Sequence, residues 1–167
     1  KNKLKVLYMD LPDYKDYDPI MSSQLVNQIS NLEFVYTIVK PQTRSNKMTF
    51  ETNNNVYISY DENSVNLIKW ADVVIVLFSS ILLEVLVQEK VLLYPRYMHN
   101  HEMIHEQFNS SWEVNSLDEL IKALNRLNDE PNYKPYSHDN VKQFINSVVY
   151  NGPTDDVLLN YKKYIMS

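Results

Sequence analysis

The chain has 167 residues, which is enough for one domain with a full hydrophobic core and short for two. Its net charge of -5, with no run of lysine or arginine, argues against a dedicated nucleic-acid binder. The absence of cysteine excludes disulfides and thiolate chemistry, and every apolar run is far shorter than the roughly 20 residues of a transmembrane helix. The sequence begins at Lys1 without a signal peptide, so we expect an excised domain or a processed product.

Segments with strand and helix patterns alternate along the chain. Strands are predicted at 4–9, 34–39, 56–59, 73–77, 91–94 and 112–114, and helices at 20–31, 63–70, 80–88, 99–109, 116–127, 139–150 and 155–166. Ser116 and Glu119 form a capping box at the start of one helix. Because several strands are continuous apolar runs, the sequence predicts an α/β, Rossmann-like three-layer domain with a mostly parallel sheet of about six strands.

The segment from Asp72 to Pro95 is the most informative about function. It is predicted to form a buried strand, a polar turn with Ser79 and Ser80 that starts a helix, and a second buried strand. Such a turn places two hydroxyls and unpaired backbone N–H groups at the carboxyl end of a parallel sheet, where anions bind. Glu84 returns to the same helix face one turn later, a position suited to ribose hydroxyls. The pattern predicts a nucleotide site.

Both features also have a simpler interpretation. Ser79 and Ser80 would serve as an ordinary helix N-cap without any ligand, because serine is favoured at that position. Glu84 would then be a solvent-facing residue, although its helix is otherwise apolar and its carboxylate must reach solvent or a ligand. Loops at 10–19, 40–44 and 95–101 are expected at the same sheet edge, where ligands bind in open α/β sheets.

The order of short motifs suggests a family. Lys40-Pro41-Gln42 follows the second predicted strand, Ser79-Ser80 and Glu84 follow the fourth, and Val91-Leu92-Leu93-Tyr94-Pro95 forms the fifth. This order resembles the C-terminal, donor-binding half of a GT-B fold glycosyltransferase. It is most similar to capsule and surface-polysaccharide enzymes, including CDP-glycerol glycerophosphotransferase-like polymerases and CMP-sugar-dependent transferases. The resemblance covers nearly the whole chain as a single nucleotide-sugar-binding domain, with residues 10–55 matching only loosely.

The resemblance implies roles for the motif residues. Ser79 and Ser80 would hold the donor phosphate or pyrophosphate, Glu84 the ribose, and Lys40 a positive charge nearby. The predicted donor-binding residues are Lys40, Pro41, Gln42, Ser79, Ser80, Glu84, Tyr94, Pro95, His99 and His101, with surface histidines as the simpler interpretation of the last two. No cofactor or bound metal is implied. The substrate would be a nucleotide-activated sugar or CDP-polyol, and an N-terminal acceptor domain would lie outside this chain.

Two positions depart from the family pattern. Gln42 stands where relatives have a histidine, so it can donate a hydrogen bond but cannot carry a proton. Glu89 stands in place of the glycine before the fifth strand, so the preceding helix lacks its preferred left-handed residue. The resemblance also implies that the general base for the acceptor comes from the other half of a GT-B enzyme, so we expect this chain to bind nucleotide without turnover. The expected location is the cytoplasm or the inner face of the membrane. The alternative is a non-catalytic nucleotide-binding or interaction module of the same fold.

A different chemistry is suggested by residues 101–105. His101-Glu102-Met103-Ile104-His105 is an H-E-x-x-H sequence, which on a helix binds zinc and uses its glutamate as general base. Glu113 or His138 would supply the third ligand. A zinc hydrolase is therefore a minor alternative.

Asp10, at the end of the first predicted strand, raises one more interpretation, the phospho-acceptor domain of a response regulator. That fold needs a phosphorylated aspartate after the third strand, where this chain has Tyr60-Asp61-Glu62. This acidic pair is better explained as lying near a helix cap, and we reject the interpretation.

Overall fold

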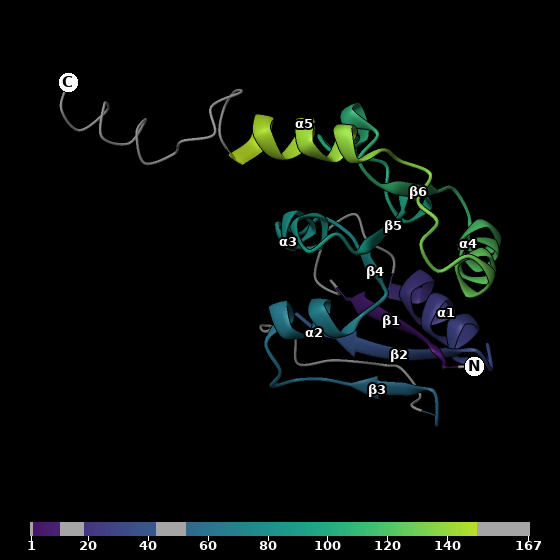
Figure 1. Ribbon diagram of the computed structural model, residues 1–167. Helices are drawn as coiled ribbons and strands as arrows, with labels where there is room; N and C mark the ends of the chain where they lie inside the picture. Colours follow the sequence, from purple (N-terminus) through teal and green to yellow (C-terminus); the bar gives the residue numbers. More distant parts are fainter. Residues whose placement is uncertain (1, 11–18, 43–52, 150–167) are drawn as a thin grey trace, which may run out of the picture.

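A parallel β-sheet forms the centre of the domain in the computed structural model, which describes residues 2–10, 19–42 and 53–149 (Figure 1). In these residues the sheet has six strands in the order β3-β2-β1-β4-β5-β6, and each neighbouring pair is parallel. The strands are β1 (Leu4–Met9), β2 (Val35–Lys40), β3 (Val56–Ile58), β4 (Val73–Val76), β5 (Val91–Pro95) and β6 (Trp112–Val114). The predicted α/β, Rossmann-like fold is confirmed.

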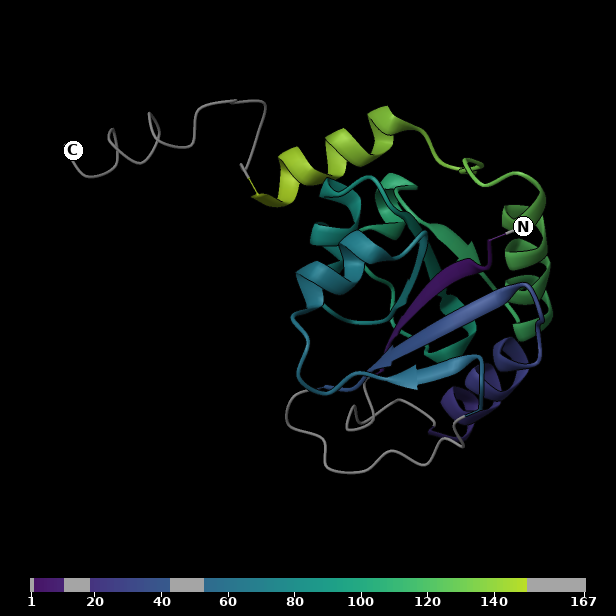
Figure 2. The same cartoon turned by 60° about the horizontal axis from the view of Figure 1, so that its bottom comes forward.

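Helices cover both faces of the sheet. They are α1 (Pro19–Ser30), α2 (Ser64–Trp70), α3 (Ile81–Val87), α4 (Leu117–Asp129) and α5 (His138–Val149), with short 3-10 helices η1 (Arg96–Met98) and η2 (Glu106–Phe108). Figure 2 shows α1 and α4 on one face and α2 and α3 on the other. This double cover explains why every residue of β4 and β5 is buried.

The core is built from the apolar runs of the central strands and the inward faces of the helices. Val6, Leu7 and Tyr8 of β1 are fully buried, and Leu25 and Ile29 of α1 pack in the same cluster. These helix residues lie four positions apart, so they share the face of α1 that covers the sheet. The core therefore holds rigid the strand ends from which the polar loops begin.

One predicted helix is wrong. Residues 99–109 do not form an α-helix, since the short 3-10 helix η2 is the one helical element in this otherwise irregular segment. His99 has an extended backbone, with φ -158° and ψ 166°, and its ring lies 4.2 Å from that of Phe78 and 5.3 Å from that of Tyr94. Packing of this side chain into the protein overrides the weak helix propensity of a His-Asn-His sequence.

The other predicted elements agree with the structure to within a few residues, apart from the predicted helix at 155–166, which lies outside the described residues. The capping box is confirmed at the serine, since Ser116 Oγ accepts a hydrogen bond from Glu119 N at 3.1 Å. Within the described ranges, no helix is both long enough and apolar enough to cross a membrane.

Candidate functional site

Three strands end at a common polar pocket. From β1 the chain runs outward through β2 to β3, and it then crosses back to β4 on the other side of β1 and continues to β5 and β6. The strand order therefore has a topological switch point between β1 and β4. Ligands bind at such a point in open α/β sheets. A pocket of about 240 Å³ opens at these carboxyl ends, and we call it the carboxyl-edge pocket. It is lined by Met9, Asp10, Lys40, Pro41, Gln42, Ser64, Ser79, Ser80 and Ile81.

The pocket contains half of the residues that were singled out from the sequence. Lys40, Pro41 and Gln42 come from the end of β2, and Ser79 and Ser80 come from the turn after β4. The two groups are nearly forty residues apart in sequence, and the order β2-β1-β4 brings them together. Pro41 is buried and Gln42 is exposed, so the amide of Gln42 is the side chain of this loop that solvent reaches most easily.

Lys40 supplies the cation of the pocket. Its side chain is only 8% exposed, and Nζ donates a hydrogen bond to the carbonyl oxygen of Tyr60 at 2.5 Å. A lysine ammonium has three N–H groups, so this bond leaves two for other acceptors. The contact with Tyr60, which follows β3, holds the charge near the strand ends.

Asp10 is the main residue of the pocket that the prediction missed. Its side chain is 3% exposed, and Oδ1 accepts a hydrogen bond from Ser22 Oγ of α1 at 2.9 Å. Ser22 Oγ also lies 2.7 Å from the hydroxyl of Tyr8, so a buried chain of polar groups fixes the carboxylate. Its position directly after a buried strand was the available signal. Ser64, the other polar lining residue that the prediction missed, is the first residue of α2 and gave no such signal.

The backbone amides that follow the serine turn have hydrogen-bond partners within the turn itself. Ser79 Oγ accepts from Ile81 N at 3.3 Å, and the amides of Leu82 and Leu83 donate to the carbonyl oxygens of Ser79 and Ser80. The expectation that these first-turn amides would be unpaired is therefore wrong. A hydroxyl that accepts one bond can still donate its own proton, so Ser79 and Ser80 offer a ligand their hydroxyls rather than the amides of the next three residues.

Glu84 does not line the carboxyl-edge pocket. It lies half-buried on α3, where Oε1 accepts a hydrogen bond from Gln88 Nε2 at 2.7 Å. Gln88 Nε2 also donates a hydrogen bond to the carbonyl oxygen of Val65 on α2. The Glu84–Gln88 pair therefore lies along the contact between α2 and α3. A role of Glu84 in binding ribose stays a prediction.

Tyr94, Pro95, His99 and His101 also lie outside the lining of the pocket. Tyr94 and Pro95 end β5 and are buried, and His99 is 5% exposed, whereas His101 is exposed. The ring of Phe78 lies 4.2 Å from that of His99 and 6.0 Å from that of His101. Phe78 directly precedes Ser79 in the sequence, so the cluster of rings formed by Phe78, His99 and His101 is next to the serine turn that lines the pocket.

Burial favours the neutral form of two histidines in this region, His99 and His105. Burial lowers the pKa of His99 to about 4, with further lowering from Arg96 and then His101. Burial also lowers the pKa of His105 to about 4, and the nearby His99 adds to this effect. His99 Nδ1 accepts a hydrogen bond from His101 N at 3.2 Å, which places the proton of the neutral ring on Nε2.

The zinc hypothesis loses its geometric basis. An H-E-x-x-H site needs a helix that turns both histidines to one face, but residues 101–105 are not helical. His105 is 2% exposed with its ring 4.2 Å from that of Tyr94, whereas His101 is exposed. In the described ranges, no group of three or more histidine, aspartate or glutamate side chains is arranged to hold a metal ion.

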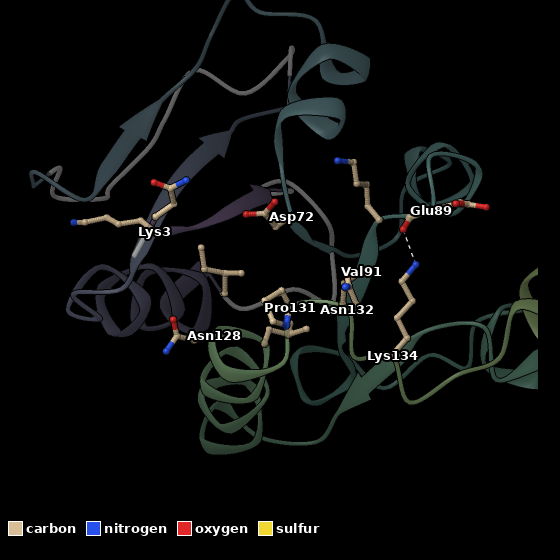
Figure 3. A pocket seen from close by; sticks show the side chains of 12 residues that line it. Lys3, Asp72, Glu89, Val91, Asn128, Pro131, Asn132 and Lys134 are labelled. Atoms are coloured by element: carbon tan, nitrogen blue, oxygen red, sulfur yellow. Dashed lines mark hydrogen bonds between the residues drawn. The ribbon is translucent and has the colours of Figure 1, made fainter.

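A larger hollow of about 650 Å³ lies at the opposite, amino edge of the sheet (Figure 3). Its walls include Lys3, Asp72 and Lys134, which approach from different elements. Lys134 Nζ donates to the carbonyl oxygen of Glu89 at 2.5 Å, so this lysine ties the loop after α4 to the end of α3. We place the candidate site at the carboxyl-edge pocket, because Lys40, Ser79 and Ser80, whose side chains suit an anionic ligand, line that pocket together.

Comparisons with known proteins were made at the level of sequence and of structure. No protein-family model and no curated protein matches the sequence. The structure is similar to the crystal structure of the glycotransferase of kitacinnamycin, with a TM-score of 0.62 and 13% identity over 97% of this chain and 42% of that one. It is also similar to Thermosulfurimonas dismutans KpsC, a beta Kdo 2,4 transferase, with a TM-score of 0.52 and 14% identity over 85% of this chain and 44% of that one.

The chain thus spans less than half the length of each matched structure. Identities of 13% and 14% define a common fold and leave the substrate open. The chain shares its α/β fold with part of each of these two transferase structures.

Proposed function

We propose that this chain is the donor-binding domain of a glycosyltransferase or polyol-phosphate transferase of bacterial capsule or surface-polysaccharide synthesis. In this proposal the carboxyl-edge pocket binds the phosphate of a nucleotide-activated donor. One observation carries it: Lys40, Ser79 and Ser80 come from separate loops and line one pocket at the switch point of the sheet. The structural likeness to two glycosyltransferases supports the reaction class.

The chemistry of the pocket suits a leaving phosphate. In group transfer, negative charge develops on the phosphate oxygens as the sugar or polyol departs, and donors fixed in advance stabilise it. Lys40 would supply the positive charge, held in place by Tyr60, and the hydroxyls of Ser79 and Ser80 would donate to the phosphate oxygens. The acceptor would be activated by groups outside this chain, so we expect binding without transfer from the domain alone.

Calorimetric titration with UDP, CDP and CMP tests the proposal. We expect binding of at least one nucleotide, and replacing both Ser79 and Ser80 by alanine should weaken it about a hundredfold or more, because each hydrogen bond to a charged group contributes about 1.5–3 kcal/mol. Ser116→Ala is the matched control, since Ser116 also accepts from an amide at a helix start but lies outside the pocket. No binding of any of the three at millimolar concentration would overturn the proposal.

The second candidate is a nucleotide-binding module that has lost catalysis. Gln42 favours it, because an exposed amide stands at the mouth of the pocket where the resembled family has a histidine. Slow hydrolysis of a nucleotide-sugar donor separates the two candidates. Hydrolysis by the natural chain, abolished by the double serine replacement, supports a catalytic domain. Tight binding with hydrolysis only in Gln42→His supports the module.

A further inference from the structure

We infer that residues 96–111, which connect β5 to β6, form a lid that opens as a unit and is coupled through Phe78 to the serine turn. We call this segment the lid. The inference goes beyond the proposed function, because it assigns a moving part to the fold and holds whatever the ligand is. Three observations carry it: the lid is bonded mainly to itself, it buries polar atoms that have no partner, and it packs against a strained residue of the serine turn.

The hydrogen bonds of the lid are mainly internal. Among the described residues, every backbone amide from 97 to 110 that donates to a backbone carbonyl oxygen does so within the lid. Arg96 and Glu106 join its two halves by an ion pair of 2.9 Å, and the pairing of β5 with β6 ties its ends together. The amide of the Asn140 side chain on α5 donates to the carbonyl oxygen of Asn109 at 3.2 Å. A compact loop with close ends and few outside bonds can move without disturbing the sheet.

The closed lid buries polar atoms without giving them partners. Among the described residues, the buried side-chain atoms with neither a hydrogen bond nor an ion pair are Tyr94 OH, Tyr97 OH, His99 Nε2, His105 Nε2, Ser111 Oγ and, elsewhere in the domain, Thr37 Oγ1. All of these except the threonine belong to the lid or to the tyrosine that directly precedes it. Each atom has lost its bonds to water and gained none in return. Water reaches these atoms when the lid opens, which offsets part of the packing that is lost.

Ring contacts hold the lid closed and join it to the serine turn. The ring of His105 lies 4.2 Å from that of Tyr94, and the ring of His99 lies 4.2 Å from that of Phe78. Phe78 has φ 37°, a left-handed backbone that a bulky residue rarely adopts, and Ser79 follows it directly. The contact with His99 stabilises this strained conformation. Opening of the lid therefore lets the serine turn relax, and by reciprocity a ligand that fixes the turn favours the closed lid.

Chemical modification of histidine tests the lid on the natural chain. Diethyl pyrocarbonate acylates accessible neutral imidazole, and mass spectrometry locates the product on each of the four histidines. At neutral pH and low extent of modification, the exposed His101 and His138 should react rapidly. His99 and His105, which are 5% and 2% exposed, should react slowly and with one common rate. That rate should hardly change with a low concentration of urea, because opening the lid exposes much less surface than unfolding does.

A pair of tyrosine variants tests the unpartnered atoms. Tyr94→Phe removes a buried hydroxyl that has no partner and keeps the ring, so it should favour the closed lid and slow both buried histidines about tenfold. Tyr136→Phe is the matched control, because its buried hydroxyl accepts a hydrogen bond from Leu92 N. This control should not slow either histidine.

A pair of phenylalanine variants tests the coupling to the serine turn. Phe78→Leu should speed the modification of both buried histidines, because the smaller side chain loses its contact with the ring of His99. Phe34→Leu, at the residue before β2, is the control and should leave the rate unchanged at low urea. Where calorimetry shows that CMP or CDP binds, the bound nucleotide should slow both histidines.

Each outcome decides one claim. Different rates for His99 and His105 in the natural chain would show that the segment does not open as a unit. A common rate that rises as steeply with urea as global unfolding would overturn the lid, and this result needs no variant. If Tyr94→Phe folds and reacts as fast as the natural chain, the unpartnered atoms do not promote opening. If Phe78→Leu leaves the rate unchanged, the coupling to the serine turn is overturned. Absence of nucleotide binding overturns the proposed function alone, because the lid and its coupling are decided by the unliganded rates.

Discussion

The amide of Asp10 donates a hydrogen bond to the carbonyl oxygen of Lys40 at 3.0 Å, which extends the pairing of β1 and β2 by one backbone bond at the carboxyl edge of the sheet. Both side chains are nearly buried, and both line the carboxyl-edge pocket. The backbone bond does not depend on either side chain. The charges of the pocket can therefore be changed one at a time while the sheet that positions them stays intact.

Lys40→Met should weaken the binding of mono- and diphosphates alike, by about ten- to a hundredfold, because hydrogen bonds to a charged group contribute about 1.5–3 kcal/mol. Methionine keeps the apolar stem of the side chain and loses the charge and the bond to Tyr60. Titration calorimetry measures the affinity, and Lys122→Met, at an exposed position on α4, is the control. Equal affinities of Lys40→Met and the natural chain would remove Lys40 from the site.

Glu89→Gly should stabilise the domain by about 0.5–1 kcal/mol. Glu89 follows the C-cap of α3 with φ 56°, in the left-handed region that disfavours a residue with a Cβ atom. The amide of Lys90 donates to the carbonyl oxygen of Val85 and that of Glu89 to Leu86, which is the Schellman pattern that usually contains glycine. Glu89 is exposed, so little packing is lost.

Urea unfolding measures the effect of Glu89→Gly. Asn109→Gly is the matched comparison, because Asn109 has φ 48° and asparagine tolerates this region better than glutamate does. The gain at position 109 should therefore be smaller. A larger gain in stability from Asn109→Gly than from Glu89→Gly would show that strain in the left-handed backbone does not determine which replacement stabilises more.

These sites show what the sequence could and could not reveal. The lack of a glycine at position 89 was visible in the sequence and predicted that α3 would end without a left-handed residue. That prediction is wrong, because Glu89 itself adopts the left-handed conformation and the Schellman bonds form. Lys40, Ser79 and Ser80 were found because polar residues that follow buried parallel strands gather at one sheet edge. The irregular segment at 99–109 was missed because it depends on the contact between His99 and Phe78, which no local pattern encodes.

Tyr136→Phe should destabilise the domain by about 1–3 kcal/mol, because it leaves a buried amide without a partner. Tyr136 OH accepts a hydrogen bond from Leu92 N at 2.9 Å in β5. The pairing of β6 with β5 begins at Leu93, so the tyrosine occupies the place beside Leu92 that β6 does not reach. Burial raises the pKa of Tyr136 to about 12. Urea unfolding measures the loss, and Tyr57→Phe, at a residue that is 54% exposed, should change stability little.

The stability of the domain should fall as pH decreases from about 6.5 to about 4. Burial lowers the pKa of His99 and His105 to about 4 in the folded protein, against 6.5 for the unperturbed side chain. Between these values the unfolded chain binds protons that the folded protein does not, so acid favours unfolding. Above pH 6.5 the contribution to stability is complete, and below that pH each histidine costs up to about 1.4 kcal/mol per pH unit.

His105→Leu isolates this effect, because leucine fills the buried space between Tyr94 and Phe144 without a group that titrates. Whatever its stability at pH 7, the variant should lose less stability than the natural chain between pH 6.5 and 4.5, as measured by urea unfolding at each pH. Burial raises the pKa of Glu113, but this carboxyl group is common to both proteins, so its titration largely cancels in the difference. His138→Gln, at an exposed position, should keep the full dependence. Parallel pH profiles for His105→Leu and the natural chain would mean that the pKa of His105 is not lowered in the folded protein.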